Sequence, residues 1–208
     1  SDEEALFVGD ILSSGYFGAE LCEIRPGDTI AVIGAGPVGL CAMECARLFG
    51  AARVIGLEPD PFRRKLAKER GLADFVVNPL KGNAEEAILS LTKGRGADGV
   101  IEAAGTPASF EMAWKIARPN SVVALVAMYE EEQRLLLPKM YGKNLIFKTG
   151  GVDAVHCGTL LDLIAARRLS TNFLITHKAP LNRILEGYSV FGERRENCLK
   201  WAVSPYER

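Results

Sequence analysis

Apolar and polar positions along the chain follow two alternating patterns. Short apolar runs rich in valine and isoleucine are separated by longer stretches in which apolar residues recur every three or four positions. The first pattern is typical of buried strands and the second of amphipathic helices. We predict strands at 29–33, 53–57, 75–77, 99–101 and 122–126, separated by helices at 40–49, 61–70, 83–92 and 107–117. This alternation indicates a doubly wound α/β fold, in which helices cover both faces of a parallel sheet.

Beyond residue 126 the pattern is less regular. It predicts a short extended piece at 134–137, a sixth strand at 145–148 that completes a six-stranded Rossmann sheet, and a long helix at 155–169. A strand, a helix at 181–191 and a strand at 199–203 follow residue 173. A terminal strand needs a sheet to join, and we expect its partner strands to lie outside this chain.

The first residues form a helical segment ahead of the first strand, with Ser1 and Glu4 placed as a capping box. We therefore divide the chain into a helical lead-in at 1–25, a dinucleotide-binding domain at 26–172 and a C-terminal return segment at 173–208.

A glycine-rich turn lies between the first predicted strand and the first predicted helix of the sheet. The strand, turn, helix and second strand end at an acid, Glu58, which is the context that a dinucleotide-binding loop requires. Glycines in such a loop permit a tight turn, close approach of the pyrophosphate, and close packing of helix on strand, while the helix N-terminus attracts the phosphates. The predicted cofactor-binding residues of this loop are Gly34, Gly36, Pro37, Val38 and Gly39.

The acid at the end of the second strand favours NAD over NADP. The Glu58 carboxylate can accept hydrogen bonds from the adenosine ribose hydroxyls, whereas a 2′-phosphate would meet Glu58 and Asp60. Arg63 and Arg64 leave an alternative open, because either guanidinium could turn towards a phosphate. A second alternative is that Glu58 is a solvated acid at a strand end and that the arginines belong to a solvated helix face.

Composition limits the classes of partner. The chain has 208 residues, 48% of them hydrophobic and 25% charged, as in an ordinary globular domain. A net charge of −1 gives no basic field for nucleic acid, and no run approaches the roughly 20 apolar residues that span a membrane. The acidic start, from Ser1 to Glu4, is the reverse of a signal peptide, so we predict a cytoplasmic protein.

The cysteines show no paired spacing and are predicted to be reduced, buried thiols. Cys41 and Cys45 are one helical turn apart, which is the spacing of a buried helix face and is weak support for a metal or redox pair. The others are Cys22, Cys157 and Cys198.

Taken in order, several segments resemble the cofactor-binding half of the medium-chain, zinc-dependent alcohol dehydrogenases. They are Gly9 to Tyr16, Pro26-Gly27-Asp28, the loop from Gly34 to Gly39, Ala97 to Glu102, Ile175-Thr176-His177 and Cys198-Leu199-Lys200. In that family the catalytic domain is split around the cofactor domain. The resemblance implies that this chain starts where the N-terminal catalytic part ends, so that most of the family's zinc ligands have no counterpart here.

The resemblance also implies roles for single residues. Asp10 matches a junction position at which some members place a zinc ligand, and Ser14 matches a position near the nicotinamide. Arg63 matches a position beside the adenine ribose, and Lys200 one that can reach the pyrophosphate. The remaining matches lie along the nicotinamide end and are Val126, Ala127, Lys148 and Thr149.

These features predict part of an oxidoreductase that transfers hydride between an alcohol (primary, secondary or polyol) and NAD, with zinc as the Lewis acid in the full-length parent. The isolated chain is expected to be inactive. The alternative is a non-catalytic, truncated NAD-binding module. A short-chain reductase is a weaker reading because its Tyr-x-x-x-Lys pair is absent. We expect a homodimer or homotetramer, partly because the resemblance implies one and partly because an apolar strand at 145–148 leaves an unpaired sheet edge.

Overall fold

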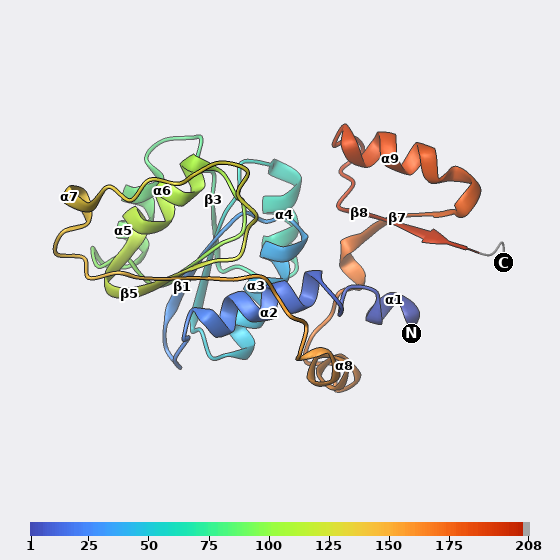
Figure 1. The fold of residues 1–208 in the computed structure, drawn as a ribbon, viewed down its shortest axis with the longest axis horizontal. Coiled ribbons are helices and arrows are strands. Elements are labelled where there is room, and N and C mark those ends of the chain that lie inside the picture. The colour runs from blue at the N-terminus through green and yellow to red at the C-terminus, as the bar shows by residue number, and fades with distance from the viewer. Residues whose placement is uncertain (206–208) are drawn as a thin grey trace.

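A six-stranded parallel sheet forms the centre of the larger part of the protein (Figure 1). The computed structural model describes residues 1–205. The strand order is β3-β2-β1-β4-β5-β6, and every neighbouring pair is parallel. The strands are β1 (Thr29–Ile33), β2 (Arg53–Leu57), β3 (Phe75–Val77), β4 (Ala97–Glu102), β5 (Ala117–Leu125) and β6 (Ile146–Thr149). The order reverses between β1 and β4, the place where open α/β sheets bind ligands.

Helices cover both faces of this sheet, as predicted. Ile30 and Val32 of β1 join the core on the face of α2 (Ile11–Leu21) and α3 (Pro37–Leu48). Ala31 and Ile33 face the other way, into a core with α5 (Ala84–Leu91) and α6 (Pro107–Ile116). The alternation follows from the two-residue period of a strand. Helix α4 (Pro61–Glu69) follows β2.

Helix α2 is built into the sheet although it precedes the first strand. A Cβ atom on Gly15 would lie 2.6 Å from Cβ of Cys41 in α3. A Cβ atom on Gly18 would lie 3.1 Å from side-chain carbons of Ile101 and Val126. These two glycines therefore allow α2 to pack closely on both α3 and the sheet.

Most predicted elements lie within a few residues of the observed ones, with two exceptions. The extended piece predicted at 134–137 is wrong: a short helix, α7 (Leu137–Met140), forms where a proline favours a first helical turn. The helix predicted at 155–169 is shorter, α8 (Cys157–Ala165). Ala154 and Arg167, with φ of 56° and 57°, take left-handed conformations on either side of it and interrupt the helix.

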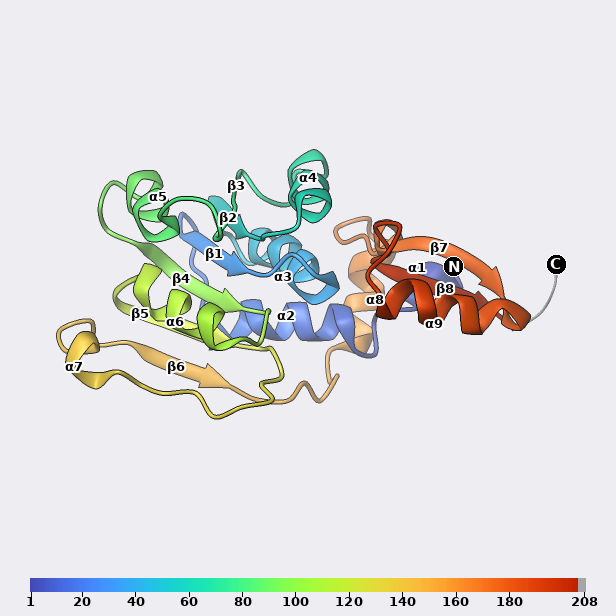
Figure 2. The ribbon, with the colours of Figure 1, turned by 90° about the horizontal axis from the view of Figure 1, so that it is seen from above.

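The C-terminal residues form a separate small unit beside the carboxyl ends of the strands (Figure 2). Here β7 (Ile175–Pro180) and β8 (Lys200–Ser204) pair in parallel, joined by α9 (Ile184–Gly192). Two 3₁₀ turns, η1 (Asn172–Leu174) and η2 (Leu181–Arg183), flank β7. The last strand was expected to pair only with strands outside this chain. This is wrong, because β8 pairs with β7. The pairing was missed because residues so far apart in the sequence leave no local signal. Residues 206–208 of the predicted return segment lie outside the described residues.

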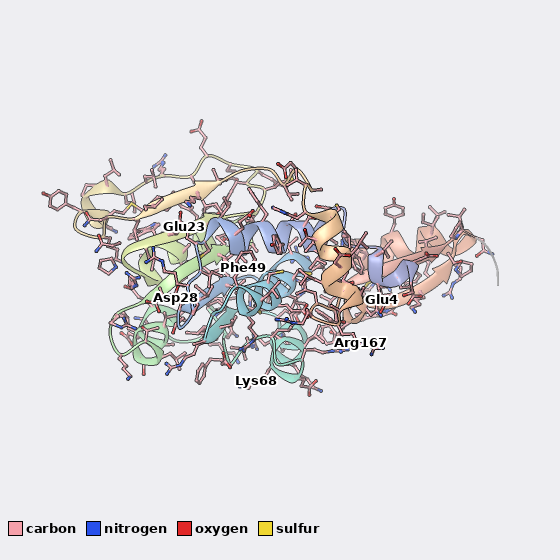
Figure 3. All side chains as sticks on the ribbon, turned by 90° about the horizontal axis from the view of Figure 1, so that it is seen from below. Glu4, Glu23, Asp28, Phe49, Lys68 and Arg167 are labelled. Atoms are coloured by element: carbon pink, nitrogen blue, oxygen red, sulfur yellow. The ribbon has the colours of Figure 1, made fainter. Side chains whose placement is uncertain are left out.

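The first helix, α1 (Asp2–Ala5), lies against this C-terminal unit. The predicted capping box is present, since Ser1 Oγ accepts from the Glu4 N–H and the Glu4 carboxylate accepts from the Ser1 amino group. Lys178 of β7 donates to both carboxylate oxygens of Glu3 at 2.7 Å. Glu4 also lies near Arg167, which follows α8 (Figure 3). The two ends of the described chain are thus brought together.

Candidate cofactor-binding site

The glycine loop after β1 has the geometry of a phosphate-binding turn. Gly34 has φ of 93°, and a Cβ atom there would lie 3.2 Å from the Ala103 backbone. A Cβ atom on Gly39 would lie 1.9 Å from the Gly34 carbonyl oxygen, so only glycine fits. By contrast, a Cβ atom on Gly36 would meet only an Arg63 guanidinium nitrogen, at 3.7 Å, within the described chain. The backbone at Gly36 is therefore open to a ligand.

Helix α3 presents its N-terminus at this open loop. It begins at Pro37, followed by Val38, and Gly36 at its N-cap provides no capping side chain. The first N–H groups of an α-helix have no acceptor within the helix, and the helix dipole adds partial positive charge there. Because the loop is open and the N–H groups are uncapped, the arrangement suits a phosphate or pyrophosphate.

Glu58 joins the phosphate loop to the end of β2. Its side chain is 5% exposed. Oε2 accepts from the Ala35 N–H at 2.7 Å, and Oε1 accepts from the Asp60 N–H at 2.9 Å. The alternative of a solvated acid is therefore wrong for Glu58. A carboxylate has about four acceptor positions, so these two bonds leave capacity for ribose hydroxyls.

The two arginines near Glu58 differ in what their guanidinium groups contact. Arg64 Nη1 donates to the backbone carbonyls of Glu58 and Pro59, at 2.8 and 2.6 Å, so this guanidinium holds the turn together. Asp60 caps α4 by accepting from the Arg63 N–H at 2.9 Å. The Arg63 guanidinium itself lies beside Gly36, on the ligand side of the loop.

A cavity of about 340 Å³ lies against this turn. One wall is the segment from Glu58 to Arg63, and the other is formed by Arg194, Asn197 and Cys198 of the C-terminal unit. A volume of this size is typical of small-molecule sites. The structure thus brings Glu58 and Arg63, two of the predicted cofactor-binding residues, together at one cavity.

The residues predicted at the nicotinamide end lie at the carboxyl ends of β5 and β6. The N–H groups of Val126 and Ala127 donate to the Glu102 carbonyl at 2.9 and 3.3 Å, and Thr149 is the last residue of β6. Lys148 instead forms an ion pair with Glu23, at the end of α2 (Figure 3). Its ammonium group is therefore already engaged.

Glu102 and Tyr129 are site residues that the sequence reasoning missed. Glu102 ends β4 and is fully buried. Its Oε1 accepts from the N–H groups of Ala104 and Gly105 at 2.8 and 3.0 Å, while Oε2 accepts from the Tyr129 hydroxyl. Burial and this carboxylate acceptor raise the pKa of Tyr129. The available signal was an acid closing a buried strand, as at Glu58, whereas nothing local pointed to Tyr129.

The residues predicted for catalysis lie together at the start of α2. Asp10 occupies the N-cap position and is exposed, and Ser14 Oγ donates to Asp10 Oδ1 at 3.4 Å. Within residues 1–205 no group of three histidine, cysteine, aspartate or glutamate side chains could hold a metal ion. His156 lies 3.4 Å from a Glu20 oxygen, while His177 stacks on Trp201 in the C-terminal unit.

Two further predictions concern residues away from the loop. The Lys200 ammonium lies 5.2 Å from the ring centroid of Phe191 in α9, so in this structure it faces the helix of its own unit.

All five cysteines are free thiols, and burial raises the pKa of Cys22 to about 12. Burial also raises the pKa values of Cys41 and Cys45, as expected for core residues.

Comparison with known proteins agrees with this geometry. The family model described as zinc-binding dehydrogenase matches residues 37–168. An alcohol dehydrogenase of Cupriavidus necator is 34% identical over 99% of this chain and 57% of its own length. An NADP-dependent isopropanol dehydrogenase of Thermoanaerobacter brockii is 36% identical over 84% of this chain and 51% of its own length. The chain thus spans little more than half the length of these relatives.

A solved structure has the same fold. Alcohol dehydrogenase TADH from Thermus sp. ATN1 superposes with a TM-score of 0.91 at 33% identity, over 97% of this chain and 58% of that one. In the described part of the chain, every helix is too short or too polar to cross a membrane.

Proposed function

Because the chain belongs to the zinc-binding dehydrogenase family, we propose that its six-stranded unit binds NAD(H) and presents the nicotinamide for hydride transfer to or from an alcohol. The observation that carries the proposal is the buried Glu58 carboxylate. It holds the phosphate loop through the Ala35 N–H and lines the cavity beside that loop. The Glu58 carboxylate thus contacts both the glycine loop, where the pyrophosphate would bind, and the cavity, where the adenosine would bind.

The same residue supports NAD as the preferred cofactor. Glu58 has acceptor capacity for ribose hydroxyl groups, and a 2′-phosphate would lie close to Glu58 and Asp60 in a partly desolvated cavity. Arg64 is engaged by backbone carbonyls, so of the two arginines Arg63, beside Gly36, keeps open the alternative of a phosphate contact. The Thermoanaerobacter brockii relative is named as NADP-dependent, so the choice of cofactor has to be tested on this chain.

Each end of the dinucleotide has assigned residues. Gly34, Gly36 and Gly39, with Pro37 and Val38, hold the pyrophosphate at the N-terminus of α3. Val126, Ala127 and Thr149 border the nicotinamide, with Glu102 fixing the first two through its carbonyl. When bound, the nicotinamide accepts or donates the hydride. Lys148 and Lys200 remain predictions for the cofactor, since their ammonium groups contact Glu23 and Phe191 in this structure.

Zinc does not fit the described residues by themselves. Catalytic zinc normally takes three protein ligands, and residues 1–205 contain no such cluster. Asp10 stays a candidate for one ligand, with Ser14 hydrogen-bonded to it. The small alcohol substrate and the cytoplasmic location stay predictions.

A non-catalytic NAD-binding module is the second candidate function. It is favoured by the absence of a metal cluster within residues 1–205. In either case the edge strand β6, with Ile146 51% exposed, supports a homodimer or homotetramer. A monomeric mass at micromolar concentration would contradict that assembly.

The test is a fluorescence titration with NADH and with NADPH, in metal-free buffer and again with added zinc. We expect saturable binding of NADH, weaker binding of NADPH, and no effect of zinc on either. Glu58→Gln should weaken NADH binding and narrow the difference between the two cofactors. Failure of the wild-type chain to bind NADH would overturn the proposal. NADH formation from NAD and an alcohol, with zinc present, would exclude the non-catalytic alternative.

A further inference from the structure

The turn between α9 and β8 belongs to the C-terminal unit but forms one wall of the cavity at the end of β2. Figure 2 shows this turn at the end of the unit that faces α3 and α4. Arg194, Asn197 and Cys198 line the cavity opposite Glu58 and Arg63. Any ligand that fills the cavity therefore contacts residues from both parts of the molecule.

The backbone of this turn is held in an unusual conformation. Arg194, Glu196 and Asn197 have φ values of 53°, 56° and 55°, a region that residues other than glycine rarely adopt. Hydrogen bonds fix the turn, because the N–H groups of Arg194 and Arg195 donate to the carbonyls of Phe191 and Val190 at 3.2 and 3.0 Å. Such conformations persist only where the surroundings determine them, and they concentrate at functional sites.

Charge distinguishes Arg194 from its neighbours. Arg195 pairs with Glu193 at 2.7 Å, and Arg183 at the start of α9 pairs with Glu186. Among residues 1–205, no acidic side chain lies within ion-pair distance of Arg194 or of Arg63. The carboxylate of Glu58, in the same cavity, accepts from two backbone N–H groups and forms an ion pair with neither arginine. Two arginines without acidic partners among the described residues thus line one cavity, Arg63 from the six-stranded unit and Arg194 from the C-terminal unit.

We infer that Arg194 binds the adenosine half of the dinucleotide, closing from the C-terminal unit the pocket that Glu58 and Arg63 form on the six-stranded unit. A planar guanidinium can stack on a purine ring and donate to ribose or phosphate oxygens. Phe62 and Pro59 provide an apolar wall in the same cavity. This inference rests on the proposed function, and it adds a binding residue from outside the parallel sheet.

The test compares Arg194→Gln with Arg183→Gln by titration of the full chain with NADH, ADP-ribose and nicotinamide mononucleotide. Arg183 is a matched control because it lies in the same unit, is 55% exposed, and does not line the cavity. Arg194→Gln should weaken binding of NADH and of ADP-ribose by about tenfold, the effect of one charge-assisted contact. Arg183→Gln should leave both within about twofold, and neither variant should change the response to the mononucleotide.

The outcomes separate this inference from the proposed function. If the wild-type chain binds NADH and Arg194→Gln binds it as tightly as Arg183→Gln does, the role of Arg194 is overturned and the proposed function stands. If the wild-type chain binds neither NADH nor ADP-ribose, both fall. Arg194→Asn removes the guanidinium while keeping a residue that tolerates the left-handed backbone, so a matching tenfold loss would show that folding is not the cause.

Discussion

The six-stranded unit and the C-terminal unit differ in how far their strands are covered. Every residue of β1 is buried, whereas β8 has no buried residue and α9 exposes 81% of Leu185 and 71% of Tyr188. Two helical layers enclose the larger sheet, and a two-stranded sheet is only marginally stable alone. The larger sheet is thus covered on both faces by helices, while the C-terminal unit shares buried residues, Leu174 and Leu199, with the core of the larger unit.

The largest effect is expected from Gly39→Ala in the six-stranded unit. The added Cβ atom would lie 1.9 Å from the Gly34 carbonyl oxygen, so the phosphate loop and α3 must separate. We expect a loss of roughly 3 kcal/mol or more in the free energy of unfolding, measured in urea, together with loss of NADH binding. The control is Gly158→Ala in α8, where nothing lies within 4 Å and alanine should stabilise the helix slightly. Equal stability of the two variants would contradict the close packing.

The second largest effect is expected on the pH dependence of stability, at the segment that joins the two units. Ser170 and Thr171 lie between α8 and β7, and the Ser170 N–H donates to Glu44 Oε1 at 3.0 Å. Within the described chain, Glu44 Oε2 is buried without a hydrogen-bond partner, and burial raises the pKa of Glu44 to about 7. Because the folded chain holds this proton more tightly, stability should fall as the pH rises from about 4.5 to about 7 and stay reduced above that range.

Glu44→Gln should remove that fall, because glutamine keeps an oxygen for Ser170 and carries no charge. At pH 8 the variant should be more stable than the wild type by about 2 kcal/mol, less than the full shift implies because the carboxyl is partly solvated. Below pH 4 the two proteins should be equally stable. The test is thermal unfolding of both proteins measured across this pH range. If their stabilities depend on pH in the same way, the raised pKa of Glu44 is contradicted.

The smallest effect is expected from Gly187→Ala within the C-terminal unit. A Cβ atom there would lie 2.8 Å from the Trp201 ring, but no residue of β8 is buried, so the ring can shift. We expect the free energy of unfolding to fall by about 1 kcal/mol. Trp201 fluorescence should change, while NADH binding stays within about twofold. Gly192→Ala, in the same helix with nothing within 4 Å, is the control. A loss of stability as large as that of Gly39→Ala would show that the two units are packed equally tightly at these glycines.

The predictable parts of the fold are those determined by nearby residues. The strands at 29–33, 53–57 and 75–77 were predicted at their observed limits, since apolar period and flanking glycines are local signals. The pairing of β8 with β7 could not be found in this way, because it depends on α9 folding back between them.

The same limit applies to the candidate site. Glu58 was found from its place at a strand end, and its burial confirms that it is more than a solvated acid. The bond from Tyr129 to Glu102 joins the loop after β5 to the last residue of β4, and Arg194 reaches the cavity only through the packing of the C-terminal unit. No sequence pattern specifies such tertiary contacts.

The close packing of α2 has a consequence for synthesis. Domains begin to fold as the chain emerges from the ribosome. Helix α2 is complete at Leu21, but Gly18 packs against Val126, just past the end of β5. The chain must therefore be translated as far as Val126 before this helix meets its full set of neighbours. Until then its apolar face is without its final cover, so the helix is enclosed only after the strands β1 to β5 have followed it from the ribosome.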